Sequence, residues 1–183
     1  MPAPAATMTD HTALRRQTLA DLLRRTAQRL PAKTAIVCGD TAWTYAEFDA
    51  LVGRLAAGLV CHGVGAGDRV AVLARNSHGF AALRFALARL GAVLVPINFM
   101  LNADEAAFIL RHAGARLLAV DAGLAALGRD AAGRDTRVEQ LLWLPSEAPA
   151  APVPGCLDFH ALAACTDAPP ETPVGEHDLL QIV

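Results

Sequence analysis

The fold is decided by the stretch from Ala88 to Leu110, which reads ARLGAVLVPINFMLNADEAAFIL. Gly91 can adopt the positive φ that a residue just past a helix end needs. The apolar run 92–95 is continuous, as in a strand that is covered on both faces, and Pro96 ends it. Asn102 followed three residues later by Glu105 has the form of a capping box for a second helix. The stretch therefore predicts a helix, a buried strand and a helix of an α/β fold.

Composition excludes several classes of function. The chain has 183 residues, and its 16 basic and 18 acidic residues give a net charge of −2. Because these charges are scattered, we expect no nucleic-acid partner and no binding to an anionic membrane. The hydrophobic fraction of 54% is high for a globular domain. It predicts an uncovered apolar face, through which the chain could form a homodimer.

Compartment signals point to the cytoplasm. Residues 1–10 lack the basic and apolar regions of a secretory signal. The longest apolar stretch, 85–101, is interrupted by Arg89, Gly91 and Pro96, so we expect no transmembrane segment. The four cysteines show no disulfide or zinc spacing: Cys38, Cys61, Cys156 and Cys165.

Helical and strand patterns alternate along the chain. Apolar periodicity predicts helices over 19–30, 45–60, 78–90 and 103–113, with weaker signals over 122–127 and 159–165. Strands are expected over 34–38 and 42–44 as a hairpin, then over 69–74, 92–95, 116–121 and 138–144. Short connections between strand and helix imply parallel strands with right-handed crossovers. The predicted fold class is α/β, a layered and mainly parallel sheet flanked by helices.

We expect three segments. Residues 1–17 form a loose arm and residues 18–144 an α/β sub-domain. Residues 145–183 contain a Pro-rich loop, a short helix and the start of a strand at Leu179–Val183. Since an apolar strand start is an unusual place for a domain to end, the sequence predicts a truncated fold.

Motifs that could carry chemistry all have simpler explanations. Gly63, Gly65 and Gly67 resemble a dinucleotide loop, but they follow a helix and precede a strand, so they predict a turn. Cys156, His160 and Cys165 lack a fourth ligand and match no zinc spacing.

Nucleophile and base patterns are also weak. Neither serine, Ser77 or Ser146, lies in a nucleophile elbow. The carboxylates of Asp104 and Glu105 suit the first turn of a helix. The aromatic residues Trp43, Tyr45 and Phe48 are expected in the core. We therefore predict no catalytic, cofactor-binding or metal-binding residue within this chain.

Several ordered motifs together resemble the adenylate-forming superfamily, which contains acyl-CoA synthetases, aryl-CoA ligases and peptide-synthetase adenylation domains. The motifs are TLADLL at 18–23, LPAKTAI at 30–36, WTYAEF at 43–48, GVGAGDRVA at 63–71 and ARLGAVLVPIN at 88–98. The continuation NFMLNADE at 98–105 is similar to fatty acyl members in particular. The resemblance covers nearly everything from Thr18 to Val183.

The resemblance implies an AMP-forming acid–thiol ligase. The intact parent would convert a carboxylic acid, ATP and CoA to acyl-CoA, AMP and pyrophosphate through an acyl-adenylate, using Mg²⁺. In the family, a run like 178–183 leads into a Ser/Thr/Gly-rich phosphate loop, so the resemblance implies that the nucleotide-binding and catalytic motifs lie beyond Val183. We expect this segment alone to be inactive and to bind none of these ligands.

Another acid substrate or another class of protein would also fit the sequence. The acid could be an aryl or amino acid of the same superfamily. Met100 departs from the Arg common at that place in the family, so this position does not specify the acid. The chain could instead be a non-catalytic interaction or dimerisation domain. A stand-alone nucleotide-binding module would need a glycine-rich turn after a strand, which the sequence lacks.

Overall fold

The computed structural model describes residues 17–148, 150–167 and 172–183. Its helices are α2 (Leu19–Arg29), α3 (Tyr45–Cys61), α4 (His78–Leu90), α5 (Ala103–Ala113), α6 (Ala125–Ala132) and α7 (Phe159–Ala163). Its strands are β1 (Thr34–Cys38), β2 (Thr41–Thr44), β3 (Arg69–Leu73), β4 (Val93–Pro96), β5 (Leu117–Asp121), β6 (Gln140–Leu144) and β7 (Leu157–Asp158). All but one residue of the predicted arm 1–17 lies outside the described residues.

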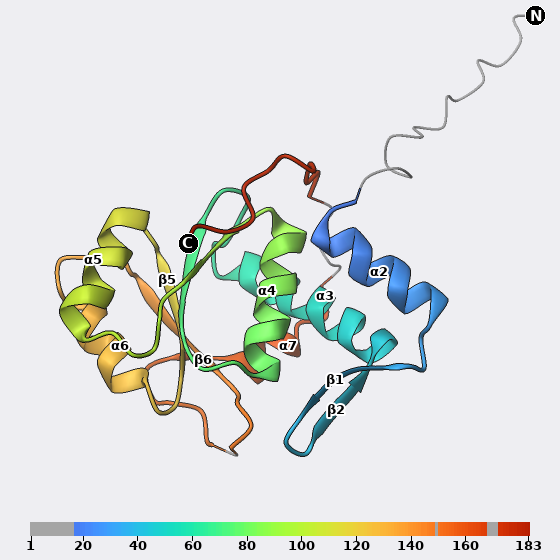
Figure 1. Ribbon diagram of the computed structural model, residues 1–183, viewed down its shortest axis with the longest axis horizontal. Coiled ribbons are helices and arrows are strands. Elements are labelled where there is room, and N and C mark those ends of the chain that lie inside the picture. The colour runs from blue at the N-terminus through green and yellow to red at the C-terminus, as the bar shows by residue number, and fades with distance from the viewer. Residues whose placement is uncertain (1–16, 149, 168–171) are drawn as a thin grey trace, which may run out of the picture.

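A five-stranded sheet forms the centre of the fold, with the order β4-β3-β5-β6-β7. Every neighbouring pair in it is parallel, and Val70 of β3 is aligned with Leu94 on one side and Leu117 on the other. Helices flank both faces of the sheet (Figure 1). The predicted α/β class with a layered, mainly parallel sheet is confirmed.

Alternate residues of β3 enter different halves of the core. Val70 and Val72 join the hydrophobic cluster that contains residues of α3, α4 and α7. Ala71 and Leu73 join the cluster that contains residues of α5 and α6. In Figure 1, α5 and α6 accordingly lie on the opposite side of the sheet from α4 and α3. This two-sided burial explains why the strand sequences are continuously apolar.

Helix ends follow the predicted local chemistry. Capping boxes are present at the starts of α2, α3 and α5, formed by Thr18 with Asp21, Thr44 with Glu47, and Asn102 with Glu105. Gly91 ends α4 with φ of 67°, a left-handed conformation that costs glycine little. Both helix ends within the stretch 88–110 therefore form as the sequence predicts.

The predicted hairpin also forms. Strands β1 and β2 pair antiparallel, with Cys38 opposite Thr41 and an irregularity between Thr34 and Ile36. The hairpin forms a separate two-stranded sheet beside α3 (Figure 1).

Four boundaries beyond residue 121 differ from prediction, among them the end of α6, which lies at Ala132 rather than Leu127. Helix α6 begins at Ala125 rather than Ala122, because Asp121 accepts hydrogen bonds from the Leu124 amide and holds the intervening residues in a turn. Strand β6 begins at Gln140 rather than Val138, and α7 ends at Ala163 rather than Cys165. The short strand β7 was not predicted; it is parallel to β6 and aligns Leu157 with Leu142.

The last residues of the chain lie beside β4. The Leu94 amide donates to the Leu180 carbonyl over 3.0 Å, and the Ile182 amide donates to the Leu94 carbonyl over 3.0 Å. The resulting bridge between Leu94 and Gln181 is parallel. The predicted strand start thus contributes to the sheet edge, and the division of the chain at residue 144 stays a prediction.

Among the described helices, none combines the length and the apolarity needed to cross a lipid bilayer.

Close contact between α3 and α7 gives the first testable prediction. A Cβ added at Gly58 would lie 2.4 Å from the Leu162 carbonyl oxygen, a backbone atom that cannot move away cheaply. We expect Gly58→Ala to lower the free energy of unfolding by about 1–3 kcal/mol, as overpacking does. Chemical denaturation measures this change.

Gly133→Ala is the matched control. Gly133 has φ of −72° and its nearest neighbours would be 3.6 Å from an added Cβ. Alanine there should be neutral or stabilise by up to about 1 kcal/mol. Equal stability of the two variants would contradict close α3–α7 packing.

Candidate functional site

The carboxyl edge of the sheet is the candidate site. From β3 the chain passes through α4 to β4 on one side, then crosses to β5 on the other side of β3. In open parallel sheets, ligands bind outside the carboxyl ends of the strands, at the point where the chain changes direction in this way. Here that point lies between the ends of β3 and β5.

Asp121, the last residue of β5, links the two strand ends. Its carboxylate accepts a hydrogen bond from the Arg75 amide over 2.9 Å and another from the Leu124 amide over 2.9 Å. The residue is only 3% exposed, and both of its oxygens are used. Asp121 is therefore placed to fix the backbone at the ends of β3 and β5.

Arg75 and Phe99 line the same edge. The Arg75 guanidinium lies 3.8 Å from the Asp121 carboxylate and 5.4 Å from the centre of the Phe99 ring. Both side chains remain substantially exposed. This arrangement positions a cation over an aromatic face beside the switch point.

The loop that follows β4 brings an apolar surface to this edge. Asn98 Oδ1 accepts a hydrogen bond from the Met100 amide over 3.0 Å and so shapes the loop. The Met100 side chain is 80% exposed. The edge therefore combines one cation with exposed apolar groups.

A hollow of about 270 Å³ lies over the start of α4, with Asn76, Ser77 and Arg84 among its lining residues. Ser77 Oγ accepts a hydrogen bond from the Phe80 amide and caps α4. Arg84 donates to Gln181 Oε1 over 2.9 Å, so the last segment of the chain reaches this hollow.

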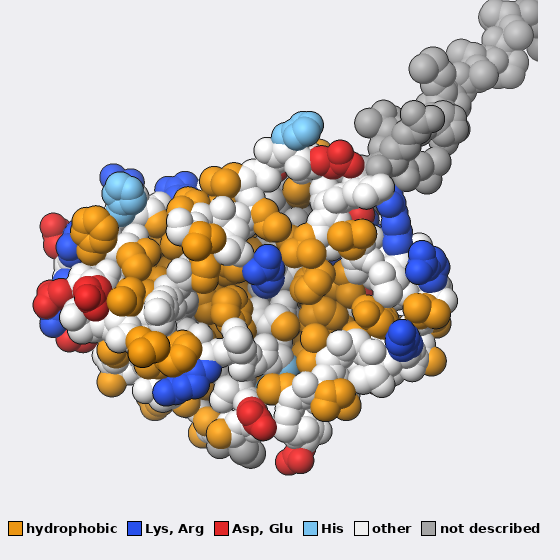
Figure 2. Space-filling view, in the orientation of Figure 1, with side chains coloured by type: hydrophobic (Ala, Val, Ile, Leu, Met, Phe, Trp, Pro, Cys, Tyr) orange, Lys and Arg blue, Asp and Glu red, His pale blue; other side chains and the backbone are white. Residues whose placement is uncertain are grey.

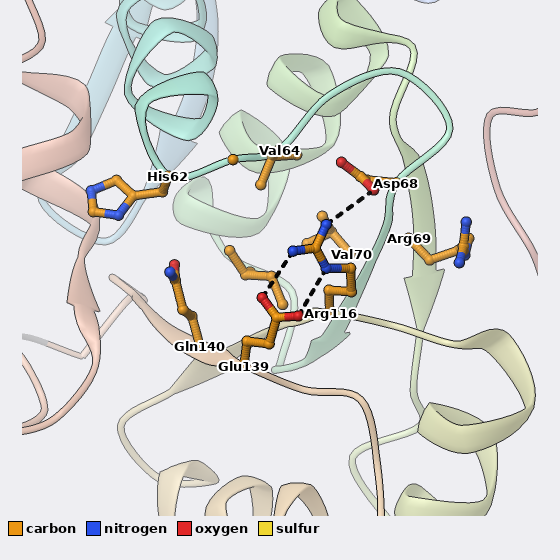
Figure 3. Close-up of a pocket in the computed structure, with 10 residues that line it drawn as sticks. His62, Val64, Asp68, Arg69, Val70, Arg116, Glu139 and Gln140 are labelled. Carbon is orange, nitrogen blue, oxygen red and sulfur yellow. Dashed lines mark hydrogen bonds and ion pairs between the residues drawn. The ribbon is translucent and has the colours of Figure 1, made fainter.

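A second pocket lies at the opposite, amino edge of the sheet (Figure 3). Arg116 points at Glu139 and donates two hydrogen bonds to it, of 3.1 and 2.9 Å, and lies 3.9 Å from Asp68. These bonds lower the pKa of Glu139. The pocket has only about 20 Å³, room for roughly one water molecule. Because its charges neutralise one another, it is a poor ligand site.

The glycines considered as a dinucleotide loop form a turn, as predicted. Gly63 and Gly67 both have φ of 79°, and the Gly65 amide donates to Asp68. The turn leads from α3 into β3 at the amino edge, away from the switch point.

The other candidates are largely dispersed. Glu105 caps α5, as predicted, and Asp104 pairs with Arg134. Trp43 stacks on Phe48 with ring centres 5.9 Å apart and packs against the core, as predicted for these aromatics. Of the set Cys156, His160 and Cys165, only Cys165 belongs to a group of at least three nearby metal-ligating residues in the described chain, and its neighbours there are different residues.

Sequence reasoning missed Arg75, Asn98, Phe99 and Asp121 as members of one edge. The usable signal was their position, because each lies at or just past the end of an apolar strand. What was lacking was the strand order, which decides which strand ends are neighbours.

The fold defines a doubly wound parallel α/β domain, whose switch point lies at the carboxyl edge of the sheet. The model of the AMP-binding enzyme family matches residues 23–183. The chain therefore belongs to the AMP-binding enzyme family, the adenylate-forming enzymes that include acyl-CoA ligases.

Similar proteins act on different acids. A feruloyl-CoA synthase of Amycolatopsis is 39% identical over 91% of this chain and 30% of its own length. A long-chain-fatty-acid–CoA ligase of Mycobacterium tuberculosis is 42% identical over 53% of this chain and 20% of its own. A crystal structure of the N-terminal domain of a Mycobacterium tuberculosis protein, FACL13, superposes with a TM-score of 0.76 at 33% identity, over 91% of this chain and 41% of that one. The chain spans less than a third of the length of the curated relatives it matches.

Asp121 gives the second prediction. In Asp121→Asn one oxygen becomes an amide nitrogen, which leaves a backbone amide unpaired, so we expect a loss of about 1–3 kcal/mol in the free energy of unfolding. Arg75→Gln removes only the exposed partner and should cost no more than about 1 kcal/mol. Denaturation of both variants measures the difference, and a larger loss from Arg75→Gln would contradict the assigned role.

His78, at the start of α4, gives the third. Its ring is buried against Trp43, with ring centres 5.3 Å apart. Burial, together with nearby His160, lowers the pKa of His78 below its usual 6.5. As the pH falls, His78 therefore binds a proton in the unfolded chain before it does so in the folded chain. The free energy of unfolding should accordingly fall as the pH drops below 6.5.

Denaturation between pH 7 and 5 tests this. His78→Phe should flatten the dependence on pH, whereas changing the exposed His177 to Gln should leave the slope unchanged. An unchanged slope in His78→Phe would show that His78 does not cause the loss.

Proposed function

We propose that this chain is the sheet scaffold of an AMP-forming acyl-CoA ligase that activates fatty acids. The whole protein would convert a carboxylic acid, ATP and CoA to acyl-CoA, AMP and pyrophosphate. A carboxylate oxygen attacks the α-phosphorus and pyrophosphate leaves; the CoA thiol then attacks the acyl carbon and AMP leaves. Family membership supports this reaction class.

The observation that carries the proposal is the parallel edge segment beside β4. Because 180–182 run in the same direction as β4, residues that follow Val183 in a longer chain would emerge at the carboxyl edge. They would lie near Asn98 and the hollow at Asn76. A phosphate loop at that place would lie at the same edge of the sheet as the ends of β3 and β5.

The described residues do not by themselves match a triphosphate site. The connection from β3 to α4 is Ala74-Arg75-Asn76-Ser77, without the glycines that let a backbone cradle phosphates. The glycine-rich turn at 63–67 lies at the other edge. We therefore assign no step involving ATP or Mg²⁺ to this chain, and assign it the role of scaffold for the carboxyl edge.

A fatty acid is the proposed substrate. The exposed apolar side chains of Phe99, Met100 and Phe108 give the loop after β4 and helix α5 a surface suited to an alkyl chain. The similarity to a fatty acid ligase agrees with this. An aryl acid is the second candidate, supported by the feruloyl-CoA synthase, whose similarity extends over more of the chain.

A dimerisation domain is the alternative from another class. Figure 2 shows hydrophobic side chains across the middle of the face on which α4 lies, with most charged side chains around its rim. Such a surface suits burial by another part of the protein or by a second copy. Light scattering separates a dimerisation domain from a face that another part of the protein covers. A molar mass that stays monomeric at every protein concentration would leave the dimerisation alternative without support.

The test of the function is a ligase assay on the protein as the cell makes it. AMP release is measured with ATP, Mg²⁺ and CoA, and with octanoate, palmitate, ferulate or benzoate. We expect AMP release with a fatty acid and little with the aryl acids. Activity with ferulate or benzoate alone would replace the substrate, and no activity with any acid would contradict the ligase proposal.

The isolated 183-residue chain gives the fourth prediction. Calorimetry with ATP and Mg²⁺ should show no tight binding, and pyrophosphate exchange should be absent, because the proposed phosphate loop follows Val183. A tight, Mg²⁺-dependent complex would contradict the assignment of this chain as scaffold alone.

A further inference from the structure

Two cysteines far apart in the sequence meet at one end of α3. Cys61 is the last residue of α3, and Cys165 lies just past α7. Both are free thiols. The ligand atoms of Cys61, Cys165 and Asp167 lie within 4.8 Å of one another. In the part of the chain that the structure describes, this is the one group of three metal-ligating side chains that are so close.

The packing of α7 on α3 holds the group in place. Arg54 of α3 donates through Nε to the Ala163 carbonyl over 2.8 Å, and Gly58 allows the Leu162 backbone to approach closely. The Cys165 amide donates to the Leu162 carbonyl over 3.2 Å, which fixes the turn that carries the second thiol. The two thiols are thus positioned by backbone contacts and do not depend on a bound ion.

The distances suit a thiophilic divalent cation. Zinc binds thiolate sulfur at about 2.3 Å and carboxylate oxygen at about 2.0–2.2 Å, so tetrahedral geometry places the two donors about 3.6 Å apart. The Cys61 sulfur lies 3.6 Å from Asp167 Oδ2. Because Asp167 is exposed, water can reach the fourth position.

We propose that Cys61, Cys165 and Asp167 form a binding site for Zn²⁺ or a similar thiophilic cation, with water as the fourth ligand. The site links the segment after α7 to the end of α3. Cys61 and Asp167 are 106 positions apart in the sequence. It lies away from the carboxyl edge and does not depend on the ligase proposal.

Binding of the cation displaces the protons of the two thiols. Two sulfur–metal bonds and one oxygen–metal bond form, water leaves the hydrated ion, and the two thiol protons pass to solvent; no electrons are transferred. Both thiols must lose their protons before they can bind the cation. Affinity should therefore increase with pH.

This proposal replaces the sequence-based expectation of no metal ligands. The spacing of the cysteines along the chain gives no zinc pattern, because the pairing depends on how α7 docks on α3. Cys156 and His160, considered together with Cys165 from the sequence, are not members of the group.

Titration of the whole chain with Co²⁺ under reducing conditions tests the site. We expect thiolate-to-cobalt charge-transfer absorption, a rise in the unfolding midpoint when Zn²⁺ is added, and release of protons. Cys61→Ser and Cys165→Ser each remove a thiolate ligand and should weaken binding by at least about tenfold, the smallest loss typical of mutating outer-shell partners. Asp167→Asn should weaken binding by no more than either cysteine variant.

Cys38→Ser and Cys156→Ser are the matched controls, since both thiols lie outside the group. They should leave the absorption and affinity unchanged. Absence of charge-transfer absorption in the unmodified chain would overturn the proposal. So would a Co²⁺ spectrum that survives Cys61→Ser and Cys165→Ser in variants that still unfold cooperatively.

Discussion

The pairing of β3 with both β4 and β5 is the constraint on which the rest of the structure depends. A strand with two parallel neighbours must be buried on both faces, so helices have to cover both, and the connections have to cross over the sheet. Val70 and Val72 contact one helical layer while Ala71 and Leu73 contact the other. From this one arrangement follow the layers and the switch point at the carboxyl edge.

The two edges of the sheet differ in a way that bears on function. At the amino edge, Arg116 is satisfied by Glu139 and lies near Asp68, which leaves little charge for a ligand. At the carboxyl edge, the Asp121 carboxylate accepts hydrogen bonds from two backbone amides, and Arg75 stays exposed beside Phe99. The charges of the amino edge thus pair with one another, whereas the carboxyl edge keeps an exposed cation beside a buried carboxylate that fixes the backbone.

Local chemistry predicted the elements well where caps and stops are strong. Asn102 caps a helix as its sequence indicates, and Gly91 ends one. Prediction was weaker after Asp121, because the Leu124 amide is held by a side chain whose role depends on tertiary structure. Strand order and the meeting of Cys61 with Cys165 were beyond reach, since both depend on contacts between distant segments.

The central claim is that the carboxyl edge faces the reacting groups of an adenylate-forming enzyme. The most direct measurement is hydrogen–deuterium exchange of the protein as the cell makes it, with and without a non-hydrolysable acyl-adenylate analogue. We predict slower exchange at 75–77 and 97–100, with no change at 62–68 and 139–140. Protection confined to the amino edge, or a tightly bound analogue that protects neither edge, would contradict the account.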